Sequence, residues 1–118
     1  MKQQITRGDI YYADLGKTIG SEQSGVRPSL IVQNNAGNRH SPTTQIVPLT
    51  TQRKKSSLPT HVRISSACGL DTASIALIEQ LRTVDKSRLD AYVGRISQSE
   101  QTAVNRALVI SIGLEVAA

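Results

Sequence analysis

The amino-acid sequence predicts a mainly β domain, a small and strongly bent antiparallel sheet or barrel that is completed by one C-terminal helix. Two observations lead to this fold class. Short runs of strand-forming residues alternate with turn signals over most of the chain. A long stretch with helical periodicity occurs only after residue 97. The chain has 118 residues, 38% of them hydrophobic, which suits a single domain spanning residues 1–118 with a packed core.

The first half of the chain is expected to contain three strands separated by loops. The three predicted strands are 9–15, 29–33 and 45–50. Segment 16–26 is rich in glycine and serine and is predicted to be a long connecting loop. Arg27 and Pro28 open the second strand, because proline as a strand's first residue needs no ladder donor, and Pro28 biases Arg27 toward an extended backbone. Segment 34–43 is predicted to be a turn-rich excursion.

The second half is expected to add strands and one helical turn. Segment 52–57 is predicted to be a basic loop, and 60–64 alternates between apolar and polar residues as a half-buried strand does. The apolar run 74–78 predicts a central strand, which continues into the polar segment 79–83. A single helical turn is predicted over 85–89.

The C-terminal helix has the clearest local signals. Ser97 and Glu100 have the spacing of a capping box, which predicts the helix start. An apolar stripe follows, made of Val104, Ala107, Leu108, Ile110, Ile112 and Leu114. The end of this stripe is wider than one face of a lone helix would bury, so a second copy of the chain is a candidate partner.

The net charge of +5 is concentrated in the middle of the chain. Residues 23–70 contain no acid and six bases, which are Arg27, Arg39, Arg53, Lys54, Lys55 and Arg63. This asymmetry favours a surface that binds a polyanion such as a nucleic acid. The alternative is a solvated basic loop that only aids solubility. Because the chain has three tyrosines and no Phe or Trp, a binding mode built on several stacking platforms is not expected.

Several classes of protein and site are not expected from this sequence. The single cysteine precludes an intrachain disulfide. His40 and His61 lie 21 residues apart without a metal-binding pattern nearby, so no metal or other cofactor is expected. Neither a secretory signal nor a membrane span is apparent. We therefore expect a cytoplasmic protein without a membrane partner.

If the polyanion is RNA, the substrate brings its own nucleophile, because the 2′-hydroxyl lies next to the scissile phosphorus. The protein then has to stabilise charge on the phosphate and assist the movement of two protons. Arg27 is a candidate for the first task, since a planar guanidinium suits a phosphate. Thr50, at the end of a neighbouring predicted strand, can supply a hydroxyl. The alternatives are a surface ion pair for Arg27 and an ordinary strand residue for Thr50.

Taken together, the motifs make the sequence resemble the MazF/PemK family of toxin endoribonucleases, and within it the chromosomal branch of Gram-positive bacteria. The resemblance covers about residues 6–115 in order. The segments that carry it are 7–15, 20–28, 32–34, 37–39, 41–43, 49–50, 58–62 and 79–89. The stretch 65–73 departs most from the family pattern.

The resemblance implies an SH3-like barrel of the PemK/CcdB type with a C-terminal helix, assembled as a homodimer. It implies sequence-specific, metal-independent cleavage of single-stranded mRNA, leaving 2′,3′-cyclic phosphate and 5′-hydroxyl ends. It also implies inhibition by a cognate MazE-like antitoxin, whose disordered acidic tail would suit the basic middle of the chain.

The same resemblance assigns roles to individual residues. Arg27 and Thr50 fall on catalytic positions of the family. Positions that resemble RNA-contacting ones are occupied by Glu22, Gln23, His61, Glu79 and Gln80. The family permits Arg27 to take part in proton transfer, but a guanidinium stays protonated in proteins, so we expect it to stabilise charge instead.

Two other functions compete with ribonuclease activity. The related toxin CcdB has the same barrel and binds DNA gyrase without catalysis. A plain nucleic-acid-binding module would also account for the charge. Arg27 followed by Pro28, together with Thr50, favours the ribonuclease over both.

Overall fold

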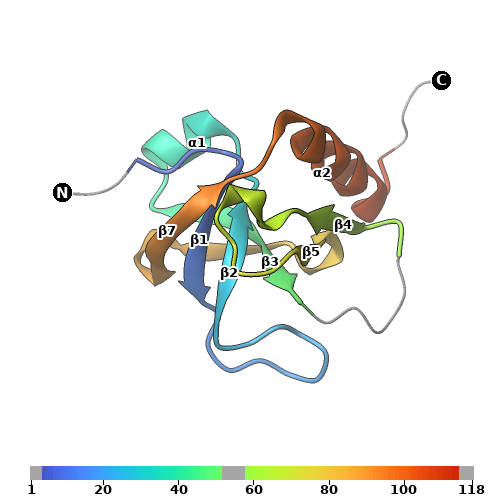
Figure 1. Cartoon of the computed structure of the whole chain (residues 1–118). Coiled ribbons are helices and arrows are strands. Elements are labelled where there is room, and N and C mark those ends of the chain that lie inside the picture. Colours follow the sequence, from blue (N-terminus) through green and yellow to red (C-terminus); the bar gives the residue numbers. More distant parts are fainter. Residues whose placement is uncertain (1–3, 52–57, 115–118) are drawn as a thin grey trace.

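The computed structural model describes residues 4–51 and 58–114, and it confirms a mainly β architecture with a C-terminal helix (Figure 1). Strand pairing is antiparallel throughout the described sheet, with the order β4-β5-β3-β2-β1-β7 and with β6 beside β3. The strands are β1 (Asp9–Asp14), β2 (Val26–Ile31), β3 (Thr43–Thr50), β4 (His61–Ile64), β5 (Ser74–Leu77), β6 (Arg82–Asp85) and β7 (Leu89–Arg95).

Helical segments connect and cover the strands. The α-helices are α1 (Asn35–His40) and α2 (Gln98–Ser111), and the 3-10 turns are η1 (Ser66–Cys68), η2 (Ile78–Gln80) and η3 (Lys86–Arg88). Figure 1 shows both α-helices at one end of the molecule, while the long β1–β2 loop projects from the other. No helix in residues 4–51 and 58–114 is long and apolar enough to cross a membrane. The predicted basic loop 52–57 lies outside the described residues.

The second strand begins at Val26, slightly before the predicted opening at Arg27 and Pro28, and it ends at Ile31 instead of 33. Pro28 is therefore the third residue of β2 and not its first. The strand tolerates this proline because pairing with β3 is recorded only from Ser29 onward. The excursion predicted over 34–43 contains the short helix α1, which is capped by the Asn34 side chain accepting the Gly37 N–H at 2.8 Å.

The predicted central strand is confirmed, but it does not continue into 79–83. The chain leaves the sheet at η2 and returns as β6 along the same edge of β3. Pro48 of β3 lies beside this interruption, between the residues that pair with β5 and those that pair with β6. Because proline has no N–H, β3 needs one ladder partner fewer at this point. The interruption turns Glu79 and Gln80 out of the sheet.

The last strand, β7, was not predicted. It pairs with β1 through two register shifts, and most of its residues are exposed or half-buried. Its sequence therefore lacks the alternation that marks a regular strand. Gly94 is required here because a Cβ at this position would lie 1.6 Å from the Cys68 carbonyl oxygen.

The start of α2 is confirmed as predicted. The Ser97 side chain accepts the Glu100 N–H, and the Glu100 carboxylate accepts the Ser97 N–H, which completes a capping box. Val104 and Ala107 are buried, but the end of the apolar stripe is not. Exposed fractions are 47% for Ile110, 59% for Ile112 and 58% for Leu114.

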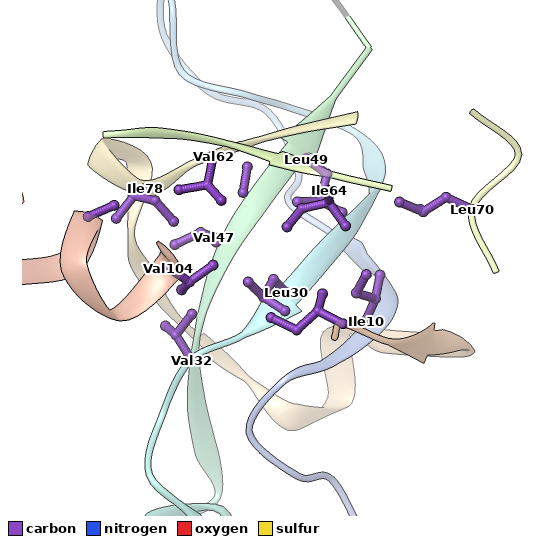
Figure 2. Close-up of a cluster of buried hydrophobic side chains, with 13 residues drawn as sticks. Ile10, Leu30, Val32, Val47, Leu49, Val62, Ile64, Leu70, Ile78 and Val104 are labelled. Carbon is purple, nitrogen blue, oxygen red and sulfur yellow. The ribbon is translucent and has the colours of Figure 1, made fainter. Parts of the chain in front are cut away.

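The buried apolar residues form two clusters. The first core lies beneath α2, where Val104 points toward Val47 and Ile78 (Figure 2). The second core is enclosed by β1, β2, β3, β6 and the start of β7, and it contains Ile5, Tyr11, Ala13, Leu15, Ile31, Ile46 and Val84. This second core has two openings. One is lined by Leu15 and Pro48, near the ends of β1 and β3, and the other by Tyr11 and Pro42, nearer the starts of these strands.

Candidate active site

The two predicted catalytic residues project from the same face of the sheet. Ser29 of β2 lies opposite Pro48 of β3. Arg27 and Thr50 each lie two residues beyond this last pair, and residues two apart on a strand share a face. An arrangement on opposite faces would have ruled out a joint role for Arg27 and Thr50.

Arg27 is oriented by the loop that precedes its strand. Its Nε donates to the Ser24 carbonyl oxygen at 2.9 Å, and the side chain is half-buried. In the part of the chain that the structure describes, the recorded salt bridges join His61 to Glu79 and Arg95 to Asp9. No described carboxylate therefore neutralises Arg27, which argues against the surface ion pair. Thr50 is 6% exposed at the end of β3.

A cleft of about 490 Å³ opens on this face at the end of the second core. Pro48 lines it, and Thr50 lies two residues further along the same face, about 7 Å away along the strand. The other lining residues are Leu15, Lys17, Thr18, Glu22, Gln23, Glu79, Gln80, Leu81 and Arg82. Four of the five predicted RNA-contacting residues thus share one cleft, although they come from segments 56 or more residues apart in the sequence.

Gln80 joins η2 to the β1–β2 loop. Its Oε1 accepts the Gln23 N–H at 2.8 Å, and its Nε2 donates to the Ser21 carbonyl oxygen at 3.1 Å. Both ends of the side-chain amide are therefore engaged with the loop backbone. The loop is held over the cleft from the η2 side.

Glu79 joins η2 to the start of β4. One carboxylate oxygen accepts from Thr60 Oγ1 at 2.9 Å, and the other lies 3.0 Å from His61 Nε2. Burial by itself raises the pKa of Glu79. Hydrogen bonds from its own backbone N–H, His61 and Thr60, and the charge of His61, outweigh this effect and lower the pKa below its ordinary value. The carboxylate form of this cleft residue is thus favoured.

His61 is the predicted residue that does not line this cleft. It reaches the site through Glu79, and its ring lines a groove between β4 and α2 instead. Its Nδ1 faces the Leu58 N–H at 3.4 Å, while its Nε2 faces Glu79.

Glu22 and Gln23 differ in what their side chains do. Glu22 Oε1 accepts the Ile19 N–H at 2.9 Å, which stabilises the turn of the loop itself. Gln23 Oε1 is buried and has no hydrogen-bond partner among the residues that the structure describes. An acceptor in this state is available to a donor that enters the cleft after a small movement of the loop.

Sequence reasoning missed Lys17 and Arg82, which add positive charge to the cleft. Arg82 pairs with Ile46 on β3, so it projects from the same face as Pro48 and Thr50. It lies in the segment that was predicted to continue a central strand, and only the interruption at η2 places it in the cleft. Cations beside a guanidinium and a hydroxyl provide the means to bind and polarise a phosphodiester.

Comparison with known proteins identifies similar sequences. A family model described as a PemK-like, MazF-like toxin of type II toxin-antitoxin systems matches residues 6–112. The Endoribonuclease EndoA of Bacillus subtilis is 45% identical over 111 residues, which span 93% of this chain and 96% of that protein. The Endoribonuclease MazF of Staphylococcus saprophyticus is 46% identical over 111 residues, which span 93% of this chain and 92% of that protein.

Solved structures show the same fold. An endoribonuclease from a mycobacterial species, determined in complex with its cognate antitoxin, superposes with a TM-score of 0.81 at 31% sequence identity. The match covers 96% of this chain and 99% of that one.

Proposed function

The chain belongs to the PemK-like, MazF-like toxin family of type II toxin-antitoxin systems, and we propose that it cuts single-stranded mRNA at specific sequences without a metal ion. Its activity is that of an endoribonuclease, and it falls in the Gram-positive branch of the family with its Bacillus and Staphylococcus relatives. The gyrase-binding alternative is not favoured.

The proposal is supported most by the shared sheet face of Arg27 and Thr50, since Pro48 on that face lines a cleft together with Lys17 and Arg82. A scissile phosphate beside Thr50 would meet a guanidinium and a hydroxyl from adjacent strands. The cations of the cleft would hold the flanking phosphates.

In the proposed reaction the ribose 2′-oxygen attacks the adjacent phosphorus. The O2′–P bond forms while the P–O5′ bond breaks, which leaves a 2′,3′-cyclic phosphate and a 5′-hydroxyl. The 2′-hydroxyl loses one proton and the departing 5′-oxygen gains one, so the reaction is balanced without water or a cofactor. Arg27 stabilises the charge that develops on the non-bridging oxygens, and Thr50 donates a hydrogen bond to the same phosphate.

Two protein partners complete the proposal. The mycobacterial relative was solved with its cognate antitoxin. We propose that a MazE-like antitoxin with an acidic segment binds this chain over its basic middle region. The exposed Ile110, Ile112 and Leu114 support a homodimer, because a second copy would cover them. Action on mRNA would place the protein in the cytoplasm. Sedimentation as a monomer at micromolar concentration would contradict the dimer.

The test is incubation of the purified protein with a long single-stranded RNA in excess chelator, followed by mapping of the new 5′ ends. We expect cleavage at a recurring sequence, 5′-hydroxyl ends, and no cleavage when the scissile nucleotide carries a 2′-deoxyribose. Loss of cleavage in chelator would overturn metal independence. Cleavage of the 2′-deoxy substrate would overturn the internal nucleophile.

A further inference from the structure

The β1–β2 loop contains the segment that orients Arg27, and the side chains that fix this segment come from two places. Arg27 Nε donates to the Ser24 carbonyl oxygen, three residues before it. Gln80, more than fifty residues away in the sequence, bonds to the backbone at Ser21 and Gln23. Ser24 directly follows the backbone that Gln80 holds, and the Ser24 carbonyl oxygen in turn orients the Arg27 guanidinium.

We propose that Gln80 is a positioning residue, which sets the orientation of Arg27 by holding residues 21–24 of the loop in place. This inference rests on the proposed ribonuclease function. The resemblance alone assigns Gln80 to direct RNA contact. In the structure both ends of its amide are engaged with the protein backbone, so its action on the substrate is indirect.

The chemistry of the side chain supports a positioning role. The loop presents one backbone N–H and one backbone carbonyl oxygen toward Gln80, and a primary amide matches this pair with one acceptor and one donor. A carboxylate in its place would accept from the Gln23 N–H but would face the Ser21 carbonyl oxygen without a donor. A thioether of similar length would supply neither bond.

The cleft also shows why the loop needs to be held. Gln23 Oε1 is buried without a partner among the described residues, which disfavours this loop position relative to one in which water reaches the oxygen. Two hydrogen bonds between Gln80 and the loop, one at the Gln23 N–H and one at the Ser21 carbonyl oxygen, oppose that tendency. Without them the loop would move toward solvent and take the Ser24 carbonyl away from Arg27.

The test compares Gln80→Met and Gln80→Glu with the matched control Gln98→Met. Gln98 is exposed at the first turn of α2, and we expect its replacement to leave cleavage unchanged. For Gln80→Met we expect kcat to fall about 10- to 100-fold by the same factor on RNAs that differ in their flanking bases, with KM changed less than threefold. Gln80→Glu should retain an intermediate kcat, because it keeps the bond from the Gln23 N–H.

Hydrogen exchange of the Gln23 amide in the RNA-free protein supplies the second readout. We expect exchange about tenfold faster in Gln80→Met than in the wild type and in Gln98→Met. If this amide exchanges equally fast in all three proteins, Gln80 does not hold the loop and the inference is wrong.

Three kinetic outcomes are decisive. Wild-type kcat in a folded Gln80→Met protein would overturn the inference. A loss restricted to RNAs with one particular base would identify Gln80 as a direct reader and would overturn it too. If the wild type cleaves no RNA, the proposed function fails, and the exchange rate at Gln23 still decides whether Gln80 holds the loop.

Discussion

The second core opens at both ends, and an amide side chain stands at each opening with partners at a different distance along the sequence. The larger hollow, about 790 Å³, lies beside α1 and includes Tyr11 in its lining. Next to it, buried Asn38 bonds to Gln33 and Thr44, which are five and six residues away. The smaller cleft, about 490 Å³, is held by Gln80, whose partners are 57 and 59 residues away.

The proposed active site lies at the smaller of the two cavities, so cavity volume alone would have pointed to the wrong end of the core. The side-chain bonds of Asn38 are local and tie a short helix to the start of β3, while Lys86 and Arg7 also bond to α1 from farther along the chain. Bonds at the cleft end bring together an exposed loop and a turn that leaves the sheet. Each end has an arginine and a threonine, so the same substitution can be made at both ends. Effects on RNA cleavage can then be distinguished from effects on the free energy of unfolding.

The arginines provide the largest expected contrast. Arg27→Ala should lower RNA cleavage about 100- to 1000-fold, because it removes the main cation opposite the developing phosphate charge. Arg39→Ala, at the end of α1 beside the larger hollow, should cleave at the wild-type rate. Initial rates on one RNA, with circular dichroism as the folding control, measure this contrast. Equal rates for the two variants would show that the cleft is not the active site.

Features that depend on residues close together in the sequence were predicted better than features that depend on distant ones. The cap of α2 at Ser97 and Glu100 is a local signal, and it was predicted correctly. The predicted residues Glu22, Gln23, Glu79 and Gln80 do meet in one cleft, but only a family resemblance brought them together in advance.

The parts that were missed depend on contacts between distant segments. β7 pairs with β1 through register shifts, which removed the alternation on which the prediction relied. The turn that carries Gln80 lies beside Pro48 of another strand, which has no N–H for a ladder bond at that point. No pattern within residues 74–83 contains that information.

The threonines of β3 offer the next contrast. Thr50→Val should lower cleavage about tenfold by removing a hydrogen bond to the phosphate, whereas Thr50→Ser should keep most of the activity. Thr44→Val removes a buried donor to Asn38 at 2.8 Å, so it should lower the free energy of unfolding by about 1–3 kcal/mol while cleavage is retained. Urea unfolding and initial rates distinguish the two effects. A large loss of cleavage in a folded Thr44→Val protein would remove the distinction between the two ends.

The stability of the fold should depend on pH through two glutamates, Glu79 in the cleft and Glu100 in α2. Burial raises the pKa of Glu79 and of Glu100, but hydrogen bonds lower both below the ordinary 4.5, for Glu100 mainly those from the Ser65 and Ser97 N–H groups. Each therefore stabilises the fold above about pH 4.5, and this contribution is lost as the pH falls through the folded-state pKa.

Replacement by glutamine tests this pH dependence. Urea unfolding between pH 7 and pH 3 should show a smaller acid-induced loss of stability in Glu79→Gln and Glu100→Gln than in the wild type. Cleavage at neutral pH should fall only in Glu79→Gln, because Glu100 lies outside the cleft. A pH dependence of stability that both variants share with the wild type would contradict the lowered pKa values.

The smallest expected effect lies at the larger hollow. The Tyr11 ring is 2% exposed and packs edge-on against Tyr92, but its hydroxyl has no hydrogen-bond partner among the described residues. Removing a buried, unpaired hydroxyl relieves its desolvation cost, so Tyr11→Phe should raise the free energy of unfolding by about 1 kcal/mol and leave cleavage unchanged. Tyr92→Phe is the matched control, because that side chain is 48% exposed and its hydroxyl stays in solvent. If Tyr11→Phe is instead less stable than the wild type, the Tyr11 hydroxyl has a hydrogen-bond partner in the hollow. The polar groups beside α1 would then be hydrogen-bonded at Tyr11 as well as at Asn38.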